Sequence, residues 1–390
     1  MNNSTFSSIL VCVIIVISSC STAPKSDNQS HRTLCVKNLD QTLESLPKYK
    51  SIRFIPLETN KNALIGNIDK LVSSDYRFYI LDQRLAESVY IYERDGSLVK
   101  TISAKGRGPK EYAYITDIGF DPFNSELVIV DPELGKIIKY DQDGNYISEE
   151  FLNFRPYNIG FVDKDTYAFK TMTAERQPIV KTIKHNGENE QIVHDIVFEL
   201  NMSYYYYFPR SPTSQLFFEF YKDTIWRIDK GEASPYYILS YKDRGMDEAD
   251  FKKLRADAVK YRRIPRFPKD RSGDLRRFLE TENYIQFFYL NLGDPAFVLV
   301  EKDSNKVINQ IGYAKLKENP LCAVYFNLFC TDKSDRLIGH ISSDLYIDIV
   351  SSSYVKDLIS KDKVIIETQG FNNQDLTTLN SNPVVTVLEL

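Results

Sequence analysis

The stretch FYILDQRLAESVYIYERDGSLVKTI, residues 78–102, has a counterpart in LVIVDPELGKIIKYDQDGNYISEE, residues 127–150. Each contains an apolar run that ends in Asp, a short polar turn, an apolar pair, an aromatic residue, an acidic residue, then Asp-Gly and a second alternating run. Asp82 corresponds to Asp131 at an offset of 49 residues. The two segments are therefore copies of one repeat.

Each copy is rich in β-branched and aromatic residues, alternates with a period of two, and turns at an Asp-Gly dipeptide that supplies the positive φ of a tight hairpin. A repeat of more than 40 residues built only from strands is typical of propeller blades. An Asp at the same place in each blade is expected to bind the backbone of the following turn. Fainter copies follow at residues 167–187, 216–231, 285–311 and 336–350.

The length of the repeating region predicts the number of blades. Residues 52–390, less an irregular part at about 244–283, accommodate about six units at a spacing of ~48 residues. We therefore predict an all-β fold, a six-bladed β-propeller over residues 51–390 with a short helical insertion. Seven blades, or a pair of β-sandwiches, are the alternatives. SIRFIPLET (51–59) and NPVVTVLEL (382–390) are both strand-like and are expected to pair and close the ring.

The N-terminus has the pattern of an export signal over residues 1–20. The apolar run ILVCVIIVI is too short to cross a bilayer and precedes Ile-Ser-Ser-Cys, which matches a bacterial lipobox. Cys20 is the predicted lipidation site, and residues 21–50 form a predicted tether. An ordinary cleaved signal is the alternative, because the segment MNNSTFSS before the run contains no Lys or Arg.

Several motifs together resemble one protein family. The lipobox, IPLET, LIGNIDKL, FYILD, YERDG, GRGPKEY, LVIVD and KYDQDG resemble the six-bladed β-propeller lipoproteins that are abundant in Bacteroidetes. The resemblance implies a propeller fold and a lipid-anchored place in the cell envelope, and it brings no catalytic residues. The residues after Cys20, STAPKSDNQ, lack a dense acidic run, which favours an outer-membrane position facing the periplasm over surface exposure.

Composition restricts the possible ligands. The net charge of −4 gives no electrostatic reason to expect nucleic acid as a partner, and a monomer is expected. The chain has four histidines and no CxxC or Cys/His spacing, so no metal site and no cofactor are predicted, although a calcium site built from carboxylates stays open. Motifs of nucleophilic hydrolases, zinc proteases and P-loop enzymes are missing, and no catalytic residue is assigned.

The stretch SAKGRGPKEY, residues 103–112, lies between the two clear repeats. Its two glycines and its proline suit an irregular crossing from one blade to the next, and strand-like sequence follows where a phosphate loop would need a helix. Arg107, Lys110 and Glu111 are candidate ligand-binding residues. They are expected either to face the channel or to bind the neighbouring blade.

Two other segments supply candidates. The insertion includes the predicted helix MDEADFKKLRADAVKYRR and is rich in bases; Arg262 and Arg263 would belong to a basic flap that binds an anion, or else to an ordinary solvated insertion. Further back, YYYYF ends at Phe208. Tyr205, Tyr207 and Arg210 are candidates for stacking on sugar rings and binding a carboxylate; the alternative is that the tyrosines only line a strand.

These features favour a non-enzymatic binding or scaffold module of the cell envelope, attached to the membrane by its lipid. Its partner would be a glycan, another anionic ligand or an envelope protein. The alternative is a carbohydrate-active enzyme, a polysaccharide lyase or hydrolase. Convergent carboxylates in the central pocket would favour the enzyme, whereas a pocket with only aromatic and basic residues would favour the binding module.

Overall fold

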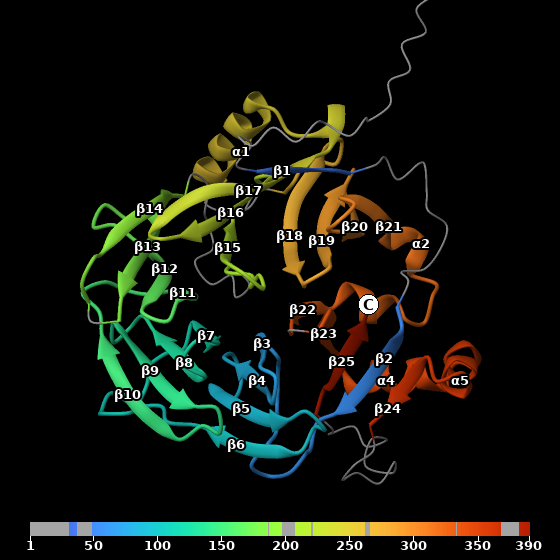
Figure 1. Ribbon diagram of the computed structural model, residues 1–390, viewed down its shortest axis with the longest axis horizontal. Helices are drawn as coiled ribbons and strands as arrows, with labels where there is room; N and C mark the ends of the chain where they lie inside the picture. The colour runs from blue at the N-terminus through green and yellow to red at the C-terminus, as the bar shows by residue number, and fades with distance from the viewer. Residues whose placement is uncertain are drawn as a thin grey trace, which may run out of the picture.

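A computed structural model describes residues 31–36, 49–185, 187–196, 207–219, 221–261, 266–332, 334–367 and 382–390. Six small sheets stand around a central channel, which confirms the predicted six-bladed β-propeller (Figure 1). In the described part of the chain, no helix is both long enough and apolar enough to span a membrane.

Blades 1 to 3 each have four antiparallel strands in chain order, with the first strand innermost. Their alternating sequences bury one apolar set against each neighbouring blade. Blade 1 consists of β3 (Lys70–Ser73), β4 (Arg77–Asp82), β5 (Ser88–Glu93) and β6 (Leu98–Ile102). Blade 2 consists of β7 (Asp117–Asp121), β8 (Glu126–Asp131), β9 (Lys136–Asp141) and β10 (Tyr146–Phe151). Blade 3 consists of β11 (Asn158–Asp163), β12 (Thr166–Met172), β13 (Pro178–Lys184) and β14 (Gln191–Asp195).

Blade 5 follows the same plan, whereas blades 4 and 6 include strands from distant parts of the chain. Blade 4 combines β15 (Gln215–Phe218), β16 (Thr224–Asp229) and β17 (Glu232–Ser240) with the distant strand β1 (Arg32–Cys35). Blade 5 has β18 (Ser272–Glu280), β19 (Tyr284–Asn291), β20 (Asp294–Glu301) and β21 (Lys306–Gly312). Blade 6 has β22 (Leu328–Thr331), β23 (Arg336–Ile341), β25 (Val384–Glu389), β2 (Ser51–Pro56) and β24 (Val364–Ile366).

Short helices fill the connections of the second half of the chain. They are η1 (Lys242–Arg244), α1 (Glu248–Tyr261), α2 (Tyr313–Leu316), α3 (Cys322–Phe326), α4 (Ser343–Ser351) and α5 (Ser353–Ser360). Ser342 and Ser352 cap α4 and α5, because each hydroxyl accepts a hydrogen bond from a backbone N–H of the first turn.

The recurring aspartates bind backbone, as predicted. Asp82 is fully buried, and its carboxylate accepts hydrogen bonds from the amides of Leu85 and Ala86 in the following turn and of Gly66 and Asn67 in the preceding loop. Asp131 accepts from two amides of its own turn and one of the preceding loop in the same way. Each aspartate therefore ties a blade to the segment that enters it.

The two ends of the chain close the ring as predicted. β2 pairs antiparallel with β25 along its whole length. The buried Asn382, just before β25, accepts from the amide of Ile65 and donates to the carbonyls of Glu58 and Ala63. This side chain holds the last strand to the entrance of blade 1.

The predicted tether is too long at its C-terminal end. Residues 32–35 form β1, which pairs in parallel with β17 on the outer edge of blade 4 (Figure 1). Leu34 is almost completely buried against that blade. Because one buried side chain in four residues gives little periodicity, the sequence did not separate this strand from its polar surroundings.

The helical insertion is also shorter than predicted. The helix is confirmed as α1, but residues 272–280, which were assigned to the insertion, form β18. Charged residues at Asp274 and Arg276 mask the alternation of this strand. One further strand prediction is wrong in part: the segment 336–350 divides into β23 and α4.

The inner strands of blades 1, 2, 3, 5 and 6 run in the same direction. A hydrogen bond between Lys70 and Asp117 joins the starts of β3 and β7, and Asp117 also accepts from the amide of Ile159 near the start of β11. At the opposite side of the ring, Thr331 at the end of β22 contacts the carbonyl of Glu280 at the end of β18. We call the two sides of the propeller the start face and the end face of these five strands.

Blade 4 runs in the reverse direction. Tyr237 of β17 donates a hydrogen bond to Glu280 at the end of β18. Tyr241, just after β17, packs on Tyr289. The residue after Tyr289, Leu290, pairs with Gly273, so Tyr241 lies near the start of β18. β17 is therefore antiparallel to β18. Since β16 pairs antiparallel with both β15 and β17, the inner strand β15 is reversed too and begins towards the end face.

Candidate functional site

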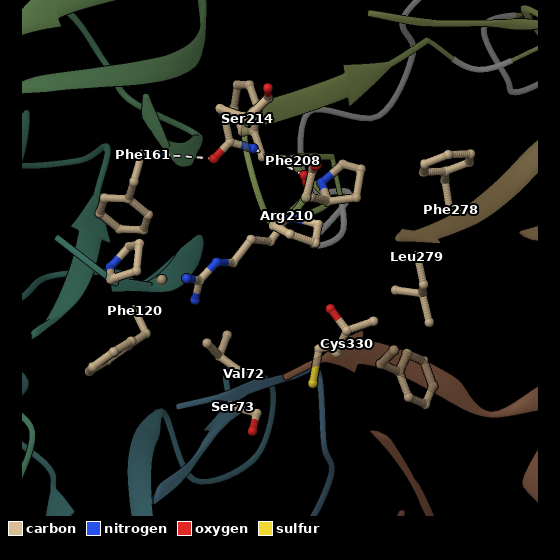
Figure 2. Close-up of a pocket in the computed structure, with 18 of the residues that line it drawn as sticks. Val72, Ser73, Phe120, Phe161, Phe208, Arg210, Ser214, Phe278, Leu279 and Cys330 are labelled. Atoms are coloured by element: carbon tan, nitrogen blue, oxygen red, sulfur yellow. Dashed lines mark hydrogen bonds between the residues drawn. The ribbon is translucent and has the colours of Figure 1, made fainter. Parts of the chain in front are cut away.

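A cavity of about 270 Å³ occupies the central channel (Figure 2). Inner strands of five blades, β3, β7, β11, β18 and β22, line it together with the segment that leads into β15. Its walls are mainly aromatic and aliphatic side chains, including Phe120, Phe161, Phe278 and Leu279. We call this space the channel cavity.

The reversal of blade 4 places a loop inside the channel. Residues 208–215 form a tight turn, closed by a bridge between Arg210 and Gln215 and by a hydrogen bond from the amide of Ser211 to the carbonyl of Ser214. The buried Gln215 side chain accepts from the amide of Phe161 (2.8 Å) and donates to the carbonyl of Pro209 (3.2 Å). These bonds fix the loop, which we call the channel hairpin, to blade 3.

Arg210 is the cation of the channel hairpin. Its side chain extends across the channel cavity towards Phe120 and Phe161, away from Phe278 (Figure 2). Although it keeps contact with solvent, desolvation by the channel walls lowers the pKa of its guanidinium, and the more distant Asp75 and Asp121 oppose this effect. Among the described residues, no hydrogen bond or ion pair involves this guanidinium, so its donors are available to a ligand.

Two other cations line the channel cavity and are already engaged. Lys70 lies 2.6 Å from Asp117, and burial raises the pKa of that carboxyl group while Lys70 lowers it. Arg277 donates to the carbonyl of Phe326 (2.9 Å) and lies 4.0 Å from the centre of the Phe329 ring. None of the described residues that line the channel cavity is a carboxylate. The charged side chains in the described lining of the cavity are therefore all cations, although the net charge of the protein is negative.

A second hollow of about 80 Å³ adjoins the channel cavity at the end face. Both are lined by Ser73, Phe120, Pro122 and Arg210, so Arg210 lies where they meet. This mouth pocket is otherwise formed by turns of blades 1 and 2 and by the residue after β22, and its other lining residues are Ser74, Asp75, Tyr76, Ser125, Gln142 and Asp332.

The structure places Arg107, Lys110 and Glu111 away from this site. They lie in the crossing from β6 to β7, as predicted, where Arg107 forms an ion pair with Glu133 of blade 2. Lys110 lies 4.7 Å from the centre of the Tyr146 ring, and Glu111 accepts from the amide of Gly108 (2.8 Å). A crossing of this kind enters the next blade at the start face, opposite the mouth pocket. Arg107 and Lys110 therefore contact the neighbouring blade, whereas Glu111 binds the backbone of the crossing itself.

The candidates from the aromatic segment, Tyr205, Tyr207 and Arg210, have different places in the structure. Tyr207 is buried, packs on Phe208 and Phe217, and lies beneath the ammonium group of Lys170 (4.5 Å), so it belongs to the core. Tyr205 lies outside the described residues, as do Arg262, Arg263 and the lipidation site Cys20. Arg210 is the predicted candidate that lines the channel cavity.

Sequence analysis missed most of the cavity wall. Phe120, Phe161, Phe278 and Phe329 come from four blades and look like ordinary strand residues. Only their inward direction in the ring distinguishes them. In the described part of the chain, no group of three or more His, Cys, Asp or Glu side chains is arranged to hold a metal ion, and Cys35, Cys322 and Cys330 are free thiols.

This arrangement suits a small anion that also carries a ring. The guanidinium of Arg210 can form two parallel hydrogen bonds with a carboxylate or sulfate. Phenylalanine rings offer faces for stacking, and the hydroxyls of Ser73, Ser211 and Thr331 can exchange hydrogen bonds with a polar ligand. Typical pockets for drug-sized ligands measure roughly 300–1,000 Å³, so the channel cavity has room for about one ring.

Comparisons with known proteins agree with the fold. The model of the family described as "Domain of unknown function (DUF4934)" matches residues 35–389. A crystal structure from Bacteroides fragilis NCTC 9343, of a protein named as an exported protein, aligns over 92% of this chain and 99% of that chain at 13% identity with a TM-score of 0.65. A member of the DUF4221 family from Bacteroides vulgatus aligns over 87% and 96% at 9% identity with a TM-score of 0.49. The search of curated protein sequences finds no match.

Proposed function

We propose that this chain, which belongs to the DUF4934 family, is a ligand-binding propeller of the cell envelope. Its ligand is a small anion of sugar size that enters the channel cavity and is held by Arg210. One observation carries this proposal: the guanidinium of Arg210 has no described partner and lies among aromatic walls that include no described carboxylate. Because an unpaired cation in a partly desolvated site is costly, a bound anion would stabilise it.

A binding role is favoured over catalysis by the same walls. A polysaccharide lyase or hydrolase needs a general acid or base, most often a carboxylate, a histidine or a tyrosine, beside the bond that it breaks. The described lining of the channel cavity is aromatic, aliphatic, hydroxylated and basic. The enzyme remains the second candidate and is tested in the same experiment by analysis of products.

The test is calorimetric titration of the chain from Ser21 onward with glucuronate, galacturonate and N-acetylneuraminate, with glucose and galactose as neutral probes. We expect the acidic sugars to bind and the Arg210→Ala variant to lose at least tenfold in affinity, about 1.4 kcal/mol. Arg107→Ala is the matched control, since Arg107 is an exposed arginine on the start face. Equal affinities of the two variants, or no binding by any acidic sugar, would contradict the proposal.

We also propose that Cys20 carries the lipid that attaches the protein to the outer membrane, facing the periplasm. The lipobox Ile-Ser-Ser-Cys supports this assignment, and so does the likeness of the fold to an exported Bacteroides protein. In cells, Cys20→Ala should abolish labelling by a fatty-acid analogue and move the protein from the detergent phase to the aqueous phase. Cys12→Ala, within the signal, is the control and should leave both unchanged.

A further inference from the structure

The channel cavity is closed at its inner end. The first residues of the five parallel inner strands, Lys70, Asp117, Asn158, Ser272 and Leu328, are all buried. Lys70, Asp117 and Ile159 are bonded to one another across three blades. Among the described residues, this layer separates the cavity from the start face, so a ligand has to enter from the end face, where the mouth pocket lies.

The rim of the mouth carries two exposed aromatic side chains. Tyr76, 63% exposed, lines the mouth pocket, and Phe123, 50% exposed, lines the channel cavity. They lie in the turns β3–β4 and β7–β8 of neighbouring blades. Large apolar side chains exposed beside a cavity are typical of ligand-binding surfaces.

Both turns are held in place by hydrogen bonds from backbone amides to nearby side chains. The hydroxyl of Ser74 accepts from the amides of Tyr76 (3.3 Å) and Arg77 (3.0 Å). Asp121 accepts from the amide of Phe123 (2.8 Å). The two rings therefore stand on fixed turns, which lowers the entropy that they lose on binding a ligand.

From these observations we infer that the channel recognises the end of an acidic glycan chain. One terminal hexuronate occupies the closed channel cavity with its carboxylate on Arg210, and the next sugars leave through the mouth pocket and stack on Tyr76 and Phe123. A chain cannot pass through the ring, so an acidic sugar in the middle of a glycan does not reach Arg210. This inference rests on the proposed function and names the ligand class of the same site.

Charges at the mouth favour a neutral second sugar. Asp75 is exposed in the mouth pocket, close enough to Arg210 to oppose the lowering of its pKa. Asp332 lies in the same pocket, where it binds Arg94 (3.0 Å) and Arg336 (2.8 Å). A second carboxylate placed here would face Asp75, so a run of uronates should bind less tightly than a single terminal uronate followed by neutral sugars.

A peptide with a free C-terminal carboxylate is the competing ligand class. Capture of a C-terminus generally uses a nest of backbone N–H groups, whereas most of the polar side chains around Arg210 are hydroxyls and the rim carries two aromatic rings. These features favour the glycan.

The experiment compares monosaccharides with trisaccharides that contain one hexuronate, either at one end or in the middle. We expect trisaccharides with a terminal uronate to bind at least threefold more tightly than free hexuronate, and those with an internal uronate to bind at least tenfold more weakly than the terminal ones. Tyr76→Ala should lose three- to tenfold in affinity for the terminal trisaccharide and leave the affinity for the monosaccharide unchanged. Phe123→Ala should lose more affinity for the terminal trisaccharide than for the monosaccharide, because Phe123 also lines the channel cavity. Tyr114→Ala, an exposed tyrosine (41%) in the crossing from β6 to β7, is the matched control.

The outcomes separate the two proposals. Equal binding of terminal and internal uronates would overturn the inference, and so would rim variants that behave like Tyr114→Ala. In either case, binding of free hexuronate would still support the proposed function. Failure of every acidic sugar to bind would overturn both. Tighter binding of a tripeptide with a free C-terminus than of any trisaccharide would overturn the assignment to glycans.

Discussion

Blade 2 and blade 4 show what a regular and an irregular blade contribute to this molecule. Blade 2 uses four consecutive strands, ties its entrance with Asp131, and points an ordinary strand end towards the mouth. Blade 4 has three strands of its own, borrows β1 from the N-terminus, and runs in the reverse direction. Its entering segment therefore reaches the end face, where it forms the channel hairpin with Arg210.

The difference separates stability from function. The repeated features of blades 1 and 2 hold the ring together and contribute no charge to the channel cavity beyond the paired Lys70. The channel hairpin, which occurs in blade 4 only, supplies a cation that has no described partner. Substitutions of the repeated aspartates in the regular blades should therefore alter stability, whereas substitution of Arg210 in the channel hairpin should alter binding.

The largest loss of stability is expected from Asp82→Ala in blade 1. The substitution leaves four backbone amides without their acceptor in a buried site, and one such buried group costs about 1–3 kcal/mol. We expect the free energy of unfolding to fall by roughly 3–4 kcal/mol, as measured by urea denaturation. Asp303→Ala, in the exposed turn between β20 and β21, is the control and should change it by less than about 0.5 kcal/mol.

Leu34→Ala should come next and should act on blade 4. Removing this buried side chain of β1 should cost about 2–3 kcal/mol. Trp226, the only tryptophan, lies in β16, so its fluorescence reports on blade 4 while circular dichroism reports on the whole ring. If β1 belongs to blade 4, the fluorescence transition shifts at least as far as the dichroism transition; an unshifted fluorescence transition would argue against the borrowed strand. Thr33→Ala, exposed on the same strand, is the control.

Asp274 in β18, beside blade 4, should make stability depend on pH. Burial raises the pKa of its carboxyl group to about 6, above the ordinary value of 3.8, and Arg276 opposes this shift. The folded state therefore favours the protonated form, and this contribution to stability is complete below pH 3.8 and is lost as the pH rises through about 6. Between pH 4 and pH 7, the stability of Asp274→Asn relative to the unsubstituted protein should rise by about 1–3 kcal/mol. A constant difference would contradict the assignment.

The smallest change in stability is expected from Arg210→Ala. The guanidinium keeps contact with solvent and has no described hydrogen bond, so the free energy of unfolding should change by no more than about 0.5 kcal/mol. The same variant should show the largest loss of affinity for acidic sugars. A large loss of stability here would mean that Arg210 supports the channel hairpin and does not serve a ligand.

The sequence predicted the ring well because its evidence is local and repeated. Asp-Gly turns, period-two alternation and the recurring Asp82 and Asp131 identify blades 1 and 2, and the strand-like ends predict the closure by β2 and β25. The direction of blade 4 was not predictable in this way. Alternation with a period of two is the same in both directions along a strand, so the reversal becomes visible in contacts between blades, such as those of Tyr237 and Tyr241.

The candidate site was predicted only in part for a related reason. The sequence identified Arg210 as a candidate because it follows an aromatic run and a proline. The same reasoning selected Tyr207, which is buried. The walls of the cavity combine one or two residues from each blade, far apart in the chain, and no local pattern marks them. Arg107 and Lys110 were candidates because they are charged residues in a glycine-rich loop. The geometry of the crossing places that loop on the start face.

A crystal structure of the chain from Ser21 onward, soaked with galacturonate, tests the central claim most directly. We expect the sugar inside the channel cavity, its carboxylate within hydrogen-bonding distance of the Arg210 guanidinium and its ring against Phe120 or Phe161. Density for the sugar on the start face near Arg107, or on helix α1 with the channel cavity empty, would contradict the account.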